Sequence, residues 1–265
     1  MLWVDQVSVS LANNKILDRI DLQALPGEVT VIIGPNGSGK STLMRAMSGD
    51  IPYEGKILLN GHDIQMLKPW DLASKRAVLP QKSILAFPFT VEEVVHIGLR
   101  NGIGAQTTKI IYDALSSVGL SAYAQRQYAE LSGGEQQRVQ LARVLAQVWT
   151  PYEMGQARWI FLDEPVSSLD IAHQIEVINI AREYARSGGG VISIMHDLNL
   201  TSMVADKIAI LHQGKTLCQG VPKDVMTDNW LSHAYECELR VNTSPKPPAN
   251  YILPHLANTH KKKVS

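Results

Sequence analysis

The strongest constraint on the fold is a glycine-rich segment, Gly34-Pro-Asn-Gly-Ser-Gly-Lys-Ser41, which stands between two differently patterned stretches. Before it, Val29–Ile33 is an unbroken run of apolar and β-branched residues, which predicts a strand covered on both faces. After it, a helix is expected from about Lys40, and Gly49 is suited to end that helix. A strand, a glycine loop and a helix in this order predict an α/β fold whose loop binds an anion at the helix N-terminus.

The residue types in this loop suit the phosphates of a nucleotide. Its glycines allow consecutive backbone N–H groups to point inward around an anion. Lys40 supplies a positive charge for the β- and γ-phosphates, and the Ser41 hydroxyl can complete the oxygen shell of Mg²⁺. A chance glycine-rich turn is the alternative, but the flanking strand and helix disfavour it. The candidate nucleotide-binding residues are Gly34, Pro35, Asn36, Gly37, Ser38, Gly39, Lys40, Ser41 and Thr42.

A second predicted strand ends in two carboxylates. Trp159–Leu162 is a short apolar run, and Asp163 and Glu164 follow it directly. Ligands of open α/β sheets bind at the carboxyl ends of the strands, so this pair is expected beside the glycine loop. A carboxylate pair at such a place is often only a helix N-cap. Next to a phosphate site we instead expect Asp163 to hold Mg²⁺ and Glu164 to act as general base for an attacking water.

The class of protein is indicated by the segment Leu131-Ser-Gly-Gly-Glu135. Together with the glycine loop and Asp163-Glu164, in this order and spacing, it resembles the ATP-binding cassette family over nearly the whole chain. The motif is expected to start a helix whose free N–H groups form a second anion site. The resemblance implies ATP as substrate and a head-to-tail homodimer, in which this motif closes over ATP bound to Lys40 of the other chain. The residues of this signature motif are Leu131, Ser132, Gly133, Gly134 and Glu135.

The resemblance also gives roles to single residues elsewhere. Gln81 matches the family's glutamine that contacts Mg²⁺ and the attacking water, and His196 matches the histidine that touches the γ-phosphate. Ser168 and Asp170 match the loop that crosses the dimer interface. Where the family offers an aromatic residue to stack on adenine, this chain has Leu11, so weaker base selection is expected. The catalytic candidates are thus Glu164, His196 and Gln81, and the Mg²⁺ candidates are Ser41, Gln81 and Asp163.

The patterning of the whole chain predicts an α/β P-loop ATPase core with a mainly parallel sheet, an N-terminal antiparallel β subdomain and a helical subdomain. Trp3–Ser10 and Ile16–Leu25 are β-rich, and a hairpin is expected over residues 56–64 with a type I′ turn at Asn60-Gly61. Residues from about 82 to 150 have helical patterns, including the capping box Thr90-Val-Glu-Glu93. We expect a single domain over residues 1–243 and a loosely attached tail over residues 244–265.

Composition narrows the partners and the compartment. The 25 basic and 25 acidic residues give zero net charge, whereas phosphate-backbone binding favours a basic excess, so nucleic acid is not an expected partner. Cys218 and Cys237 are too few for a disulfide framework and lack CxxC spacing, which suits a reducing compartment. No run approaches the ~18 apolar residues that span a bilayer, and the start lacks the basic region of a secretory signal.

The resemblance favours a transporter subunit, because the chain has one cassette and no coiled-coil heptads between Gln81 and Leu131. Four segments are similar to ATPases of iron-chelate and cobalamin importers, and within them to those of haem importers: Arg76–Gln81, Ala86–Glu93, Leu141–Gln147 and Trp149–Ala157. This implies ATP hydrolysis that powers haem (hemin) import through a separate membrane permease dimer, with a periplasmic substrate-binding protein as an indirect partner. The implied location is peripheral, at the cytoplasmic face of the bacterial inner membrane. A ferric siderophore or cobalamin importer, and a soluble ABC ATPase not linked to transport, are the alternatives.

An apolar stretch, Ile84-Leu-Ala-Phe-Pro-Phe89, falls soon after Gln81. In the family this region receives the permease's cytoplasmic helix. Phe87 and Phe89 suit a hydrophobic core equally well. We expect at least one of the two rings to line a docking groove.

Overall fold

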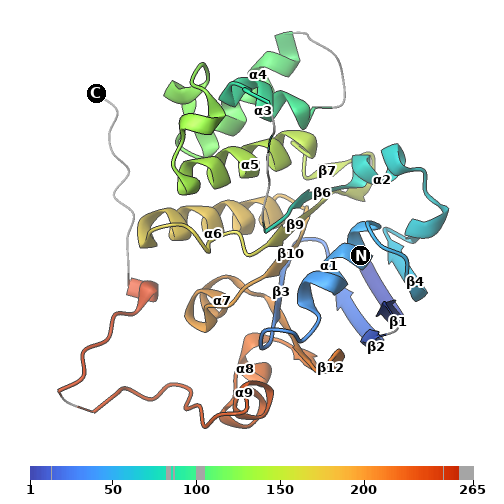
Figure 1. Cartoon of the computed structure of the whole chain (residues 1–265), viewed down its shortest axis with the longest axis vertical. Helices are drawn as coiled ribbons and strands as arrows, with labels where there is room; N and C mark the ends of the chain where they lie inside the picture. The colour runs from blue at the N-terminus through green and yellow to red at the C-terminus, as the bar shows by residue number, and fades with distance from the viewer. Residues whose placement is uncertain (13, 82–84, 86, 100–104, 247, 257–265) are drawn as a thin grey trace.

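The computed structural model describes residues 1–12, 14–81, 85, 87–99, 105–246 and 248–256. The described residues form a six-stranded sheet, a four-stranded sheet, a small two-stranded sheet of β7 and β8, and a set of helices. The helices α3, α4 and α5 lie together at one end (Figure 1). Within these ranges, none of the helices combines the length and the apolar character that crossing a bilayer requires.

A six-stranded, mainly parallel sheet forms the centre of the chain, as the sequence predicts. Its strand order is β12-β11-β3-β10-β9-β6, and β11 with β12 is the antiparallel pair. The three central strands are buried along their whole length, because other elements cover both faces of the sheet. The carboxyl ends of the parallel strands therefore share one edge. The strand bounds are β3 (Val29–Ile33), β6 (Arg76–Leu79), β9 (Trp159–Asp163), β10 (Gly190–Ile194), β11 (Lys207–His212) and β12 (Lys215–Gly220).

The N-terminal sheet is antiparallel, with the strand order β2-β1-β4-β5. Asn60 and Gly61 have φ angles of 52° and 82°, the left-handed values that a type I′ turn requires, so this predicted turn is confirmed. The second strand of the hairpin ends at Asp63, one residue earlier than predicted, because the Asp63 side chain accepts a hydrogen bond from the Gln65 backbone N–H and starts a 3₁₀ turn at Ile64. The bounds are β1 (Leu2–Leu11), β2 (Asn14–Ala24), β4 (Glu54–Leu59), β5 (His62–Asp63) and the turn η1 (Ile64–Met66).

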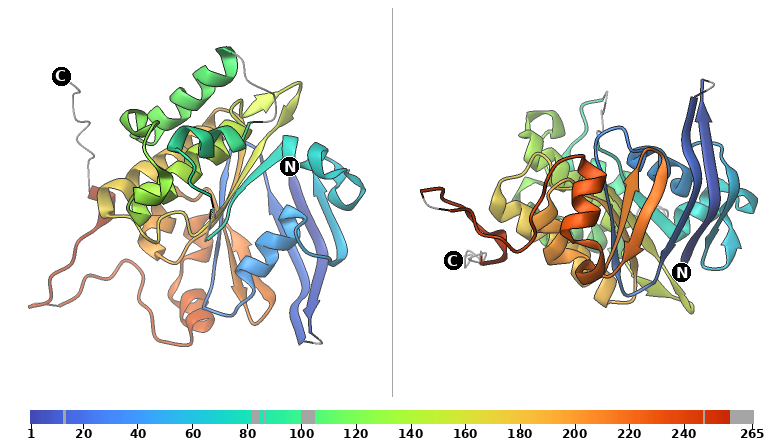
Figure 2. Two further views of the ribbon diagram at one scale, coloured as in Figure 1. Left: turned by 45° about the horizontal axis from the view of Figure 1, so that its top comes forward. Right: turned by 90° about the horizontal axis from the view of Figure 1, so that it is seen from below.

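Helix α1 (Lys40–Ser48) lies between the two sheets (Figure 2). Its buried side chains Leu43, Met44 and Met47 belong to one hydrophobic cluster with residues of both sheets. The helix ends as predicted at Gly49, whose φ is 78° and whose N–H donates to the Ala46 carbonyl at 3.0 Å. Packing on both sides holds the helix start next to the glycine loop.

In the helical region, α3, α4 and α5 pack on one another, and α5 also packs on β6. The capping box at Thr90 is present, with its hydroxyl accepting from the Glu93 N–H and the Glu93 side chain accepting from the Thr90 N–H. The end of α5 is tied to the sheet, because the Gln147 amide donates to the Arg76 carbonyl at 3.1 Å. The bounds are α2 (Pro69–Lys75), α3 (Val91–Ile97), α4 (Ala105–Ser117), η2 (Ser121–Tyr123), η3 (Tyr128–Glu130), α5 (Gly133–Gln147), β7 (Tyr152–Glu153) and β8 (Gln156–Ala157).

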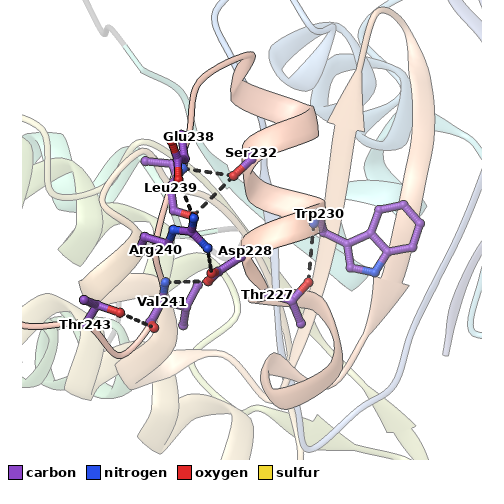
Figure 3. A network of polar contacts seen from close by, with 9 residues as sticks. All are labelled: Thr227, Asp228, Trp230, Ser232, Glu238, Leu239, Arg240, Val241 and Thr243. Atoms are coloured by element: carbon purple, nitrogen blue, oxygen red, sulfur yellow. Dashed lines mark hydrogen bonds and ion pairs between the residues drawn. The ribbon is translucent and has the colours of Figure 1, made fainter.

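The chain after β12 is anchored by a network of polar contacts around α9 (Figure 3). The Asp228 carboxylate accepts from the Val241 N–H at 2.7 Å and pairs with Arg240 at 3.2 Å, while the Ser232 hydroxyl accepts from the Leu239 N–H at 2.9 Å. These bonds fold residues 238–241 back onto the helix. The remaining elements are α6 (Ile171–Arg186), α7 (Leu198–Val204), α8 (Pro222–Val225), α9 (Asp228–Tyr235) and η4 (Pro254–Leu256).

Part of the expected tail contacts the rest of the chain. The 3₁₀ turn η4 lies against α7, and the His255 imidazole and the Ser202 hydroxyl are 2.9 Å apart. The stretch before it, residues 244–246 and 248–253, is exposed, and the ribbon runs away from the core there (Figure 1).

Candidate functional site

The glycine loop leaves β3 at the carboxyl edge of the central sheet. Gly34 has a φ of 146°, and a Cβ there would lie 2.1 Å from the Leu211 carbonyl oxygen of the neighbouring strand β11. Gly39, which caps α1, has a φ of 100°, and a Cβ there would lie 2.5 Å from Leu17. Backbone conformation and close packing thus both require glycine at these two positions.

Lys40 is the first residue of α1, and its side chain turns back over the loop. The ammonium donates to the carbonyl oxygens of Gly34 and Pro35, each at 2.9 Å, and the residue is only 5% exposed. Burial lowers the pKa of Lys40, while Glu164 and Asp163 oppose that shift. The charge is therefore held close to where a bound phosphate would lie.

Asp163 ends β9 next to the glycine loop. The residue is 8% exposed, and within the described chain its Oδ1 atom has no hydrogen-bond partner. Burial raises the pKa of Asp163, and a hydrogen bond with the Ser41 side chain opposes the rise. A buried carboxylate oxygen without a partner, beside a hydroxyl group, is a donor set that suits a hard cation.

Glu164 and His196 come from neighbouring strands and meet at the same edge. Strand β9 pairs with β10 so that Asp163 lies opposite Ile194, which brings the residues after both strands together. His196 Nε2 and Glu164 Oε1 are 2.6 Å apart. The backbone of Glu164 is left-handed, with a φ of 53°, and its N–H donates to the Ile194 carbonyl at 3.1 Å. Glu164 and residues of the glycine loop line the same pocket.

These side chains surround a pocket of about 310 Å³. Most of the lining was expected from the sequence, but Ile16 was not, and it adds an apolar wall from β2. Sequence patterning gives no signal for Ile16, because its place depends on how the two sheets pack. Leu11, at the expected adenine-stacking position, is 38% exposed at the end of β1 and does not line this pocket. The lining residues are Ile16, Asn36, Gly37, Gly39, Lys40, Ser41, Thr42, Glu164 and His196.

The signature motif forms the start of α5, as predicted. Ser132 is the N-cap, and its N–H and hydroxyl both donate to the Glu135 carboxylate, at 2.8 and 2.7 Å. The Ser132 hydroxyl and N–H lower the pKa of Glu135. Of the described residues that line the 310 Å³ pocket, none comes from this motif.

The other predicted residues lie around the same edge. Asp170 caps α6 by accepting from the His173 N–H at 3.0 Å, and it is exposed, as is Ser168. The His173 backbone N–H lowers the pKa of Asp170. Gln81 is exposed and follows β6 by two residues, next to the end of β9, but it does not line the 310 Å³ pocket. Its neighbours 82–84 lie outside the described residues.

A phosphate loop, a carboxylate pair at the edge of a parallel sheet and a separate capped helix define an ATP-binding cassette. The ABC transporter family matches residues 17–167, more than half of the chain, and the chain belongs to this family. It is accordingly a nucleotide-binding and nucleotide-hydrolysing subunit.

Particular relatives are similar over nearly the full length. The protein named Hemin import ATP-binding protein HmuV of Jannaschia sp. (strain CCS1) is 60% identical over 257 residues, 97% of this chain and 95% of its own length. A protein of the same name from Rhizobium meliloti (strain 1021) is 48% identical, covering 97% and 99%. The ADP conformation of MJ1267, an ATP-binding cassette of an ABC transporter, has a TM-score of 0.77 at 24% identity, covering 90% of this chain and 99% of that one. That last likeness concerns the fold alone.

Proposed function

We propose that this chain is the ATP-hydrolysing subunit that powers haem import through a separate membrane permease. The observation that carries the proposal is the set of relatives, 48 to 60% identical over nearly the whole chain, that are named hemin import ATP-binding proteins. Ferric siderophore and cobalamin remain the alternative cargoes, since an ATPase subunit does not meet the cargo. A soluble ABC ATPase without a permease is the alternative from another class.

ATP binding is assigned to the glycine loop and the start of α1. The backbone N–H groups of Gly34 and of residues 36–42 surround the phosphates, and the helix N-terminus adds its positive end. The Lys40 ammonium exchanges its bonds to the two loop carbonyls for bonds to the β- and γ-phosphates. Ile16 contributes apolar contact for the nucleoside, which partly offsets the absence of an aromatic residue at Leu11.

Ser41 and Asp163 are the residues that would hold Mg²⁺. The partnerless Oδ1 of Asp163 and the neighbouring Ser41 hydroxyl support this. Gln81, which follows β6 beside the end of β9, is proposed to complete the set. The described residues contain no group of three or more His, Cys, Asp or Glu that could hold a metal ion. When bound, Mg²⁺ neutralises charge on the phosphates.

Glu164 is proposed as the general base that takes a proton from the attacking water. Glu164 and Lys40 line the same pocket. The contact with His196 at 2.6 Å orients that carboxylate and places the imidazole where it can touch the γ-phosphate. Gln81 is proposed to contact the same water.

A homodimer with two-fold symmetry would complete each site. The N-terminus of α5 begins at an exposed Ser132, and none of the described residues that line the pocket of its own chain comes from it. Residues 131–135 of one chain are proposed to close over the ATP of the other, with Ser168 and Asp170 at the interface. Closure that depends on ATP then moves the permease, and hydrolysis resets the dimer.

The permease is proposed to contact the chain at Phe87. This side chain is 71% exposed, whereas Phe89 is half-buried against the main core, and the two rings lie 6.0 Å apart. Ile84 and Ala86 lie outside the described residues. Phe87→Asp should separate the ATPase from the permease and leave ATP binding intact; retained coupling would remove Phe87 from the docking surface. This assignment places the chain at the cytoplasmic face of the inner membrane, with the periplasmic binding protein an indirect partner.

The test of the proposal is uptake by vesicles that contain the membrane complex co-purifying with this chain. Haem, a ferric siderophore and cobalamin are offered in parallel, with wild type and Glu164→Gln. ATP-dependent haem uptake that Glu164→Gln abolishes supports both class and cargo. Uptake of another cargo overturns haem alone, while the lack of a membrane partner and of any transport overturns the transporter assignment.

A further inference from the structure

The backbone of Glu164 requires support from its surroundings. A left-handed conformation in a residue other than glycine costs about 1–3 kcal/mol and persists only where neighbouring groups hold it. The Glu164 carbonyl oxygen accepts from the Ser167 N–H at 3.3 Å and from the Ser167 hydroxyl at 3.2 Å. It also accepts from the Gln137 side-chain amide at 3.1 Å. Among these donors, Gln137 alone comes from another element of the fold.

Gln137 lies one turn into α5, on the side that faces the residues after β9. Its Nε2 donates to the Glu164 carbonyl, and its Oε1 accepts from the Ser168 hydroxyl. The loop also rests on the helix start, because a Cβ at Gly134 would lie 3.3 Å from the Ser168 carbonyl oxygen. One amide therefore joins the loop at two points to the helix that begins with the signature motif.

We propose that Gln137 is a positioning residue for ATP hydrolysis. It holds the Glu164 backbone in the left-handed conformation, and so keeps the carboxylate in contact with His196 and directed at the pocket. Gln137 is not among the described residues that line the 310 Å³ pocket. Through α5 it also connects Glu164 with Ser132, the N-cap of the helix, which is proposed to contact the ATP of the other chain. The inference rests on the general-base role of Glu164 proposed above.

The test uses the purified full chain with Gln137→Met, which keeps the side-chain length and removes both hydrogen bonds. Small displacements of a catalytic group lower rates strongly, so kcat for ATP hydrolysis should fall about tenfold or more while KM for ATP stays within about twofold. The matched control is Gln140→Met, on the same helix, which loses a bond of 3.1 Å to the Tyr128 hydroxyl. The kcat of Gln140→Met should stay within about twofold of wild type, even where its Tm falls as much as that of Gln137→Met.

A double variant separates positioning from general damage. If Gln137 acts through Glu164, Gln137→Met should cause no further loss of residual hydrolysis in Glu164→Gln. A loss that multiplies in this background, or an unchanged kcat in Gln137→Met alone, overturns the inference. If Glu164→Gln hydrolyses ATP near the wild-type rate, the general-base role and this inference are overturned together. If Glu164→Gln loses most of its hydrolysis while Gln137→Met keeps the wild-type kcat, only the inference is overturned. Should Gln137→Met not fold, Gln137→Glu keeps the acceptor for Ser168, lacks the donor to Glu164, and should show the same loss of kcat.

Discussion

Replacing Lys40 with methionine should weaken ATP binding strongly while changing the stability of the ATP-free chain little. The ammonium is 5% exposed and donates two bonds of 2.9 Å to loop carbonyls. Hydrogen bonds from a charged group contribute about 1.5–3 kcal/mol each, whereas burying an ammonium costs several kcal/mol. The two effects offset one another, so the free energy of unfolding without ATP should change by no more than about 2 kcal/mol.

The loss should appear in binding. With ATP present, the Lys40 side chain makes charge-assisted bonds to phosphates, and losing about 3–4 kcal/mol weakens binding roughly 100- to 1000-fold. At an MgATP concentration about 100 times the wild-type Kd, bound nucleotide stabilises the fold by about 2.7 kcal/mol. The same concentration stabilises a variant with a Kd about 100-fold higher by only about 0.4 kcal/mol.

Thermal unfolding with and without MgATP measures both quantities. For a chain of this size about 1 kcal/mol shifts Tm by roughly 2–4 °C, so MgATP should raise the wild-type Tm by about 5–10 °C and that of Lys40→Met by about 1 °C. The exposed Lys15, replaced in the same way, is the control and should keep the full shift. A wild-type shift in Lys40→Met would refute the phosphate role, and a fall of Tm by more than about 10 °C without ATP would refute the offsetting energies.

Three further changes follow from particular contacts. Asp163→Asn should keep or raise the Tm without ATP and abolish hydrolysis. Burial raises the pKa of Asp163, so the ionised carboxylate destabilises the fold at neutral pH. The difference in Tm between the variant and wild type should therefore shrink as the pH falls toward 4. Gly98→Ala should lower the unfolding free energy in urea by about 1–3 kcal/mol, because its Cβ would lie 2.2 Å from the Arg143 carbonyl oxygen. Asn60→Ala should cost about 1–3 kcal/mol in urea, because the buried Trp159 indole N–H loses its acceptor at 3.1 Å.

Each of these three predictions would be contradicted by a particular result. A lower Tm in Asp163→Asn at neutral pH would mean that the carboxylate stabilises the fold through Lys40. Wild-type stability in Gly98→Ala would mean that α3 and α5 can separate without loss. An unchanged midpoint in Asn60→Ala would mean that water replaces the amide at the Trp159 indole.

The sequence by itself determines the elements whose chemistry is local. The strand at Val29–Ile33, the glycine loop and the cap at Thr90 follow from residue order over a few positions, since turns, caps and helix starts depend on near neighbours. The placement of Glu164 near the loop was also predictable, because parallel strands end at one edge. The resemblance to the ATP-binding cassette family, carried by Leu131–Glu135, supplied the class.

Only the tertiary structure decided contacts between residues far apart in the sequence. Ile16 lines the pocket because α1 packs between two sheets. Position 34 has no room for a Cβ because β11 lies against the loop. The left-handed Glu164 and its bond from Gln137, 27 positions earlier, leave no pattern in the sequence. Periodicity records which face of an element is apolar, but the partner of a single polar group depends on how elements pack, and packing is a property of the whole fold.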